Sequence, residues 1–244
     1  MDTQRYVSRE LTHFVGRGRK TLGQQYEVLR RILSERALRA PKPERFRHTP
    51  YVLRIYRFGL SENRAYRGSV VCFCDIPQGD LGLHMRKYGR FGLAFAKDFL
   101  LEQGATPVTY IPDRGRPDIL PWPGYARGVV SSNARAYDEF WERFRKLRQL
   151  AQGESFSPQL SELVGEVSAF QDIHVVSRLK FFNPSVPESH EQNFYMEREW
   201  RVSRDVRFTL RDVRRVILPE SYARKFRRDF PRYSGELIFA ETPR

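Results

Sequence analysis

The sequence predicts an α+β fold: a mixed or antiparallel sheet core with flanking helices and a helical insertion. Strand-like runs rich in β-branched and aromatic residues alternate with amphipathic helical runs, without a fixed repeat. The 244 residues are 40% hydrophobic, which is enough to bury a substantial core. Four prolines and three glycines lie between residues 112 and 128, ahead of two helical stretches. We therefore expect one domain over residues 1–244, with residues 112–170 inserted in it.

In the first half of the chain, the sequence predicts three helices and several strands. Residues 8–14 alternate apolar and polar side chains, as in a strand. A helix is expected at 24–36, where apolar residues recur at helical spacing. Strands are expected at 51–58, 68–76, 91–96 and 107–111. Because glycine often ends helices, a short helix before Gly89 and another before Gly104 are predicted between the later strands.

The second half predicts two long helices and a return to strands. The first helix spans about residues 132–152, and the second, about 157–170, begins at a Ser-Pro pair typical of a helix start. Further strands are expected at 173–182, 194–203, 214–218 and 236–240, with a helix at 220–229 between the last two.

Composition excludes several classes of protein. No apolar run approaches the roughly 20 residues that span a bilayer, and the N-terminus lacks the apolar core of a secretory signal. We therefore expect a cytoplasmic protein with no membrane partner. Cys72 and Cys74 lie two apart on a predicted strand and cannot form a disulfide framework. Since no second pair or nearby histidine completes a ligand set, no metal is expected.

The charge balance predicts an anionic partner. Lysine and arginine number 43 against 29 acidic residues, a net charge of +14, and most of the basic residues are arginine. Arginine binds phosphates through its planar fork and stacks on bases, so nucleic acid or a phosphate-bearing substrate is predicted. A GC-rich genome would also favour arginine over lysine, although it would not explain the net charge. The residues expected to contact nucleic acid are Arg90, Arg201, Arg204, Arg214, Arg215, Arg227 and Arg228.

Three stretches contain residues that could take part in catalysis or ligand binding. They are residues 8–14 with His13, residues 71–77 followed by His84 and 87–92, and residues 195–201. In a strand, alternation would place Glu197 and Glu199 on one face about 7 Å apart, where repulsion can separate their pKa values. Each stretch also has a purely structural interpretation. In the same order, these are a histidine whose hydrogen bonds are made with the backbone, a buried strand with a glycine-rich turn, and an exposed charged strand.

At these stretches the sequence resembles the AbiGi family of bacterial abortive phage-infection proteins, from about residue 6 to residue 230. The resemblance is carried, in the same order, by SRELTHFVGR at 8–17, VCFCDIP at 71–77, His84 with KYGRFG at 87–92, and YMEREWR at 195–201. It implies a role in anti-phage defence, in a family usually described as the antitoxin side of a two-gene system. The implied partner is a nucleotidyltransferase-like toxin.

A looser resemblance is to ADP-ribosyltransferases of the DarT and arginine-modifying kinds. These begin with a strand carrying His or Arg, continue with a helix and end with a strand carrying a catalytic glutamate, sometimes as Glu-x-Glu. The resemblance implies that His13 holds the adenosine ribose of NAD, that Glu199 binds the nicotinamide ribose and stabilises the transition state, and that Glu197 positions the acceptor. The middle strand, Cys-Phe-Cys, departs from the Ser-Thr-Ser of that family. The implied cofactor site comprises His13, Phe14, Arg17, Phe73 and Tyr88.

Three functions follow as hypotheses. The favoured one is an ADP-ribosyltransferase-like defence enzyme that modifies nucleic acid or protein with NAD, in a cleft joining His13, residues 71–92 and Glu199. The second is a non-catalytic antitoxin or regulator that binds nucleic acid or a toxin through a basic surface. The third is a nuclease with Asp75, Glu197 and Glu199 around magnesium.

Overall fold

A computed structural model describes residues 8–41, 59–63, 70–115, 132–151, 157–187, 190 and 193–240. Within these residues it contains six α-helices and eleven strands, which confirms the predicted α+β class. The chain divides into two compact units. The first comprises Met1–Pro41, Val70–Pro107 and Glu197–Arg244, and the second comprises Lys42–Ser69 and Val108–Met196.

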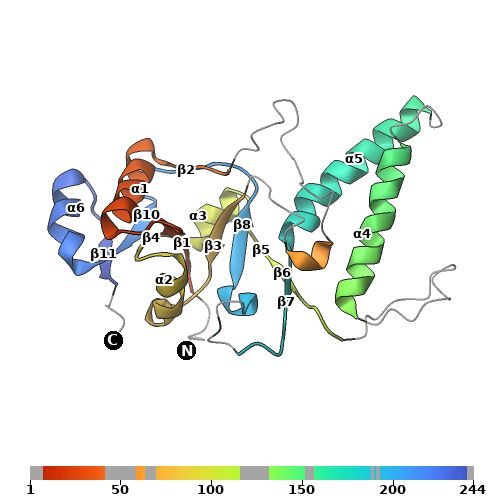
Figure 1. The fold of residues 1–244 in the computed structure, drawn as a ribbon. Helices are drawn as coiled ribbons and strands as arrows, with labels where there is room; N and C mark the ends of the chain where they lie inside the picture. The colour runs from red at the N-terminus through yellow and green to blue at the C-terminus, as the bar shows by residue number, and fades with distance from the viewer. Residues whose placement is uncertain are drawn as a thin grey trace, which may run out of the picture. The chain divides into compact units, whose positions relative to one another are not determined.

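A mixed seven-stranded sheet forms the centre of the first unit (Figure 1). In spatial order its strands are β11 (Glu236–Phe239), β10 (Val213–Leu218), β4 (Phe91–Ala96), β1 (Glu10–Val15), β3 (Val71–Cys74), β8 (Glu199–Val202) and β5 (Thr106–Pro107). β10 and β11 run parallel, and the other neighbouring pairs run antiparallel. In the same unit, β2 (Ala37–Leu38) pairs with β9 (Val206–Arg207).

Helices cover both faces of this sheet. The main core lies on one face, where Leu11, Phe73 and Phe95 pack against α1 (Leu22–Glu35), α3 (Lys97–Glu102) and α6 (Ala223–Asp229). The other face carries Phe14, Cys74 and Ile217, which pack with Leu81 and Met85 at the short helix α2 (Gly82–Tyr88). Because successive side chains of a strand point to opposite faces, each strand contributes to both layers.

The second unit pairs two long helices with a small parallel sheet. β6 (Thr109–Pro112) pairs with β7 (Leu179–Phe182), and α4 (Asn133–Leu150) lies beside α5 (Pro158–His174). The predicted start of α5 is confirmed, since the Ser157 hydroxyl accepts a hydrogen bond from the Leu160 amide. Trp141 of α4 packs with Ile111 and Phe181 in the core of this unit.

Two predicted strands are wrong at their N-terminal ends. The strand expected at 173–182 begins only at Leu179, because α5 continues to His174 and a 3-10 helix, Val176–Arg178, follows it. The strand expected at 194–203 begins only at Glu199, because residues Phe194–Glu197 form a 3-10 helix. The strand expected at 51–58 lies outside the described residues.

Candidate functional site

The sheet register decides which of the predicted site residues share a face. Thr12 of β1 lies opposite Cys74 of β3, and Cys74 lies opposite Glu199 of β8. Side chains opposite one another in an antiparallel pair point to the same face, so Glu199 projects toward the α2 side of the sheet. His13 follows Thr12 and projects to the other side, where its ring lies 5.7 Å from that of Phe73. The structure therefore does not bring His13 and Glu199 into one cleft.

His13 is held by the backbone of the neighbouring strand. Its Nδ1 lies 2.8 Å from the carbonyl oxygen of Cys72. Because a carbonyl oxygen only accepts, Nδ1 carries the proton in this contact. Burial lowers the pKa of His13, and the hydrogen bond to Cys72 offsets part of that effect. This is the backbone-satisfied histidine that the sequence left open as an alternative.

Glu197 is not part of β8, contrary to the predicted alternation with Glu199. Arg198 between them has a φ of 41°, a left-handed conformation that breaks the regular strand geometry. The Glu197 side chain is 5% exposed and forms an ion pair with Lys87 at 2.5 Å. It also accepts a hydrogen bond from the Tyr88 hydroxyl. Burial and the nearby Glu197 charge raise the pKa of Tyr88, so the phenol stays protonated and donates.

The two other candidate carboxylates are also buried beside cations. Glu199 binds Arg201 at 2.8 Å, and both side chains are largely inaccessible. Asp75 binds Lys97 at 2.8 Å, accepts a hydrogen bond from the Ser8 amide and lies 3.6 Å from Arg198. In the part of the chain that the structure describes, no three His, Cys, Asp or Glu side chains are grouped as a metal site requires.

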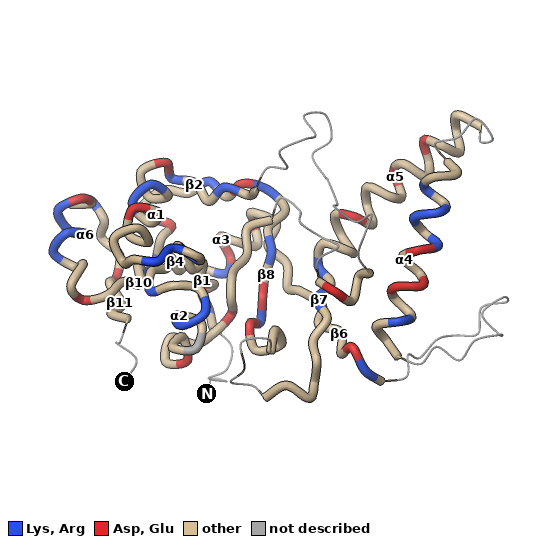
Figure 2. The backbone as a smooth tube through the Cα atoms, viewed as in Figure 1, with Lys and Arg blue, Asp and Glu red and all other residues tan. Residues whose placement is uncertain are grey.

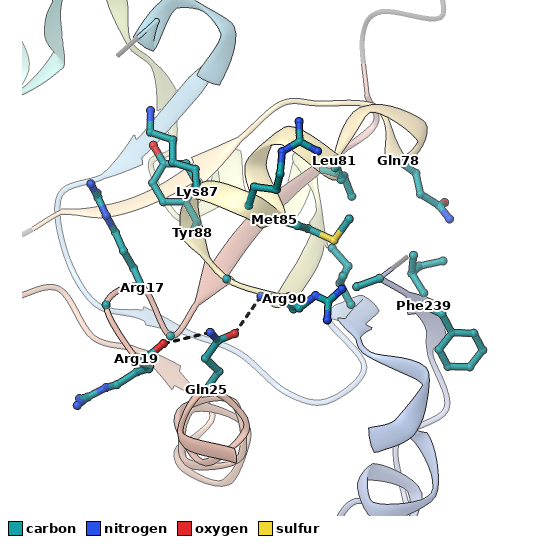
Figure 3. A pocket seen from close by; sticks show the side chains of 18 of the residues that line it. Arg17, Arg19, Gln25, Gln78, Leu81, Met85, Lys87, Tyr88, Arg90 and Phe239 are labelled. Atoms are coloured by element: carbon teal, nitrogen blue, oxygen red, sulfur yellow. Dashed lines mark hydrogen bonds between the residues drawn. The ribbon is translucent and has the colours of Figure 1, made fainter. Parts of the chain in front are cut away.

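A large open pocket lies beside this buried layer, between the turn after β1, the helix α2 and the end of β11 (Figure 3). Its volume is about 1400 Å³. Among the described residues that line it, the charged ones are all basic: Arg17, Arg19, Arg86, Lys87 and Arg90. The apolar side chains of the lining include Leu81, Met85, Ile217, Ile238 and Phe239. A cavity with this lining suits an anion that also carries an apolar group.

Tyr88 connects the pocket with the buried carboxylate. Its ring lines the pocket, with the guanidinium carbon of Arg17 5.1 Å from the ring centroid. Its ring also stacks against Phe14, with 6.5 Å between the centroids. Of the predicted cofactor residues, the structure therefore brings Phe14, Arg17 and Tyr88 together. It places His13 and Phe73 on the opposite face of the sheet.

Gln25 of α1 ties the two cation-bearing loops together. Its Oε1 accepts a hydrogen bond from the Arg90 amide at 3.0 Å, and its Nε2 donates to the Arg19 carbonyl oxygen at 3.3 Å, as the dashed lines in Figure 3 show. Gly16 and Gly89 both have positive φ and leave room for this contact. A Cβ on Gly16 would lie 2.7 Å from Gln25 Cγ, and one on Gly89 would lie 2.8 Å from the Val15 carbonyl oxygen.

The arginines predicted to contact nucleic acid fall into three groups. Arg201 forms a buried ion pair with Glu199. The half-buried Arg215 contacts Gln78, Glu10 and Glu236. Arg90 is half-buried in the pocket. The remaining four are exposed: Arg204, Arg214, Arg227 and Arg228.

Sequence reasoning did not single out Gln25, Arg19 or Arg86 as site residues, whereas Lys87 lies in the candidate stretch 87–92. The signal that would have found the cations is the basic glycine-containing turn at 16–20 together with the similar run at 86–90. Gln25 had no such signal, since its partner Arg90 is 65 positions away.

The comparisons with known proteins identify a family of phage-resistance proteins. Residues 63–230 match the model of the family described as "Putative abortive phage resistance protein AbiGi, antitoxin". The chain belongs to the AbiGi family, whose description is one of abortive phage resistance and of the antitoxin role. No curated protein and no solved structure matches the chain. Among the described residues no helix has the length and apolar composition needed to cross a membrane.

Proposed function

We propose that this chain is a non-catalytic antitoxin that acts by binding, with nucleic acid as the ligand of its first unit. The antitoxin description of the family supports the role and implies a cognate toxin partner. The observation that carries the proposal is the burial and ion pairing of the candidate carboxylates. Glu197, Glu199 and Asp75 are each buried and each paired with a cation in the same unit.

This pairing favours a structural role for the carboxylates over a catalytic one. A carboxylate that holds a ribose hydroxyl or activates a nucleophile has to reach the reacting atoms. Here the oxygens of Glu197 contact Lys87 and Tyr88, and those of Glu199 contact Arg201. Removing either partner of such a buried pair costs stability, which gives these glutamates a role in folding.

The exposed arginines of the first unit support nucleic acid as the ligand. Residues 201–233 contain eleven basic and four acidic residues. Figure 2 shows basic residues along α6 and along the β2 segment. Among them Arg228 is 76% exposed, and its neighbour Arg227 is exposed as well. Such arginines bind phosphate oxygens with little dependence on base sequence.

Fluorescence anisotropy with a short labelled DNA duplex, over a series of salt concentrations, tests the proposed ligand. We expect binding whose log K falls with log salt by about 0.9 for each phosphate contacted. The Arg227→Gln/Arg228→Gln variant should bind more weakly and with a shallower slope. Arg30→Gln is the control, because Arg30 is another exposed arginine of the first unit and is paired with Glu27. Absent binding, or binding insensitive to salt, would overturn the nucleic-acid proposal.

A second assay tests the non-catalytic part. The purified chain is supplied with NAD and with nucleic acid or protein acceptors, and free nicotinamide is measured. We expect no release above the level of buffer. Release that disappears in Glu199→Gln, while the circular dichroism spectrum is kept, would instead establish the ADP-ribosyltransferase hypothesis.

A further inference from the structure

We propose that the basic pocket between the turn after β1, α2 and the end of β11 binds a nucleoside phosphate, either as a free nucleotide or as part of a single-stranded nucleic acid. This site is separate from the exposed arginines of α6. Neither Arg227 nor Arg228 is among the residues that line it.

The cationic wall supplies the phosphate-binding half of the site. Arg17 and Arg19 come from the turn after β1, and Arg86 and Arg90 come from α2 and the residue beyond its end. The carboxylate behind this wall, Glu197, is already paired with Lys87. Among the described residues that line the pocket there is no carboxylate, so the field of these clustered cations attracts an anion.

The apolar wall supplies the half that receives the base or sugar. Leu81 and Met85 from the α2 region pack with Ile217 and Ile238 of the sheet, and Phe239 also lines the pocket. Figure 3 shows Met85 and the side chain of Arg90 on neighbouring parts of this wall. Inorganic phosphate would leave these side chains in water, whereas a nucleotide covers them and places its phosphates on the arginines.

The size of the pocket bears on the length of the ligand. Its volume of about 1400 Å³ exceeds the range of about 300–1,000 Å³ in which small ligands are usually enclosed. A short single-stranded segment uses the available space more fully than one mononucleotide.

The two loops that carry the arginines are held in place before a ligand arrives. Gln25 bonds the Arg90 amide and the Arg19 carbonyl, and the positive φ of Gly16 and Gly89 sets the close approach of these loops. Binding to loops already held in this way requires less ordering than binding to loose ones. Gln25 is thus a positioning residue for the site.

Isothermal titration calorimetry at fixed salt tests the proposal with four probes: tripolyphosphate, ATP, NAD and a 5′-phosphorylated single-stranded DNA tetramer. We expect the nucleoside phosphates to bind at least about tenfold more tightly than tripolyphosphate, with the tetramer tightest if the source is nucleic acid. NAD or ATP binding tightest would also support the proposal, with a free nucleotide as the source. Equal affinity for tripolyphosphate and ATP, or no binding by any probe, would overturn it.

Variants separate this site from the proposed duplex-binding surface. Arg17→Gln/Arg86→Gln should weaken every nucleoside phosphate by at least about tenfold, since charged hydrogen bonds to phosphate are lost. Arg227→Gln/Arg228→Gln is the matched control and should leave these affinities within about twofold, while it weakens duplex binding. Loss of nucleotide binding in the α6 variant alone would place the ligand elsewhere and overturn the pocket proposal. Failure of duplex binding with nucleotide binding kept would overturn only the proposed function.

Discussion

Tyr88 donates its hydroxyl hydrogen to the buried carboxylate of Glu197, and its ring forms part of the wall of the basic pocket. One side chain thus joins the surface where a ligand would lie to the charged layer beneath it. Lys87, the preceding residue, binds the same carboxylate. Lys87 therefore balances the charge of Glu197 while Tyr88 donates a hydrogen bond to it, and both residues fix α2 to the segment that leads into β8.

The hydrogen bond from Tyr88 should contribute measurably to stability. Tyr88→Phe removes the hydroxyl and leaves Glu197 with Lys87 as its charged partner, so we expect a loss of about 1.5–3 kcal/mol in the free energy of unfolding. Urea unfolding followed by circular dichroism measures it. Tyr195→Phe is the control, because that side chain is 54% exposed and its loss should cost less than about 0.5 kcal/mol. Equal effects of the two variants would show that the Tyr88 hydroxyl carries no stabilising contact.

The Glu199–Arg201 pair should matter more for stability than an exposed pair of the same kind. Glu199→Gln removes a counter-charge from a guanidinium that is only 12% exposed, which should cost about 3 kcal/mol. Glu139→Gln breaks the pair with Arg135, whose side chain is 62% exposed, and should cost less than about 1 kcal/mol. Urea unfolding of both variants decides the point, and a mild effect of Glu199→Gln would favour a functional role for this glutamate.

His13 should make the first unit less stable in acid. Its pKa in the folded chain is lowered below the ordinary value of 6.5, so the unfolded chain binds this proton more readily. The stabilising contribution is complete above about pH 6.5 and is lost as the pH falls toward the lowered pKa. His13→Asn keeps a side-chain donor for the Cys72 carbonyl but does not titrate. Thermal unfolding from pH 7.5 to 5 should therefore show a smaller drop in Tm for this variant than for the wild type, and His190→Asn, at an exposed position, should resemble the wild type.

Much of the fold could be predicted because local sequence signals, such as residues that begin or end helices, agree with the folded structure. The Ser157-Pro158 pair begins α5 as expected, and Gly89 ends α2 as expected. The strand at 194–203 was misjudged because its aromatic residues favour a strand, whereas Tyr195 packs its ring against Tyr110 and Phe182 from a 3-10 helix. Tertiary packing overrode local propensity there.

The candidate site was harder to predict because it depends on register. Alternation along residues 10–15 shows that His13 and Phe14 point to opposite faces, but it does not show which face Glu199 shares. That choice follows from the pairing of Thr12 with Cys74 and of Cys74 with Glu199, which are long-range contacts. The resemblance to ADP-ribosyltransferases implies Tyr88 and Arg17, and both lie in short basic, glycine-containing runs.

The backbone of Gly89 should be among the most sensitive positions of the pocket. Its φ of 117° and ψ of 165° lie in a region that residues other than glycine rarely adopt, and an added Cβ would meet the Val15 carbonyl oxygen at 2.8 Å. Gly104 also has a positive φ, 83°, but an added Cβ there would have nothing within 4 Å.

Gly89→Ala should therefore cost about 3 kcal/mol, and Gly104→Ala only about 1 kcal/mol. Urea unfolding measures both free energies. Hydrogen exchange at the Arg90 amide gives a second reading, because this amide bonds to Gln25 and should exchange faster in Gly89→Ala but not in Gly104→Ala. If both variants lost the same stability and the Arg90 amide stayed protected, the loop would adapt to a side chain at position 89. The arginines of the pocket would then not depend on this glycine for their placement.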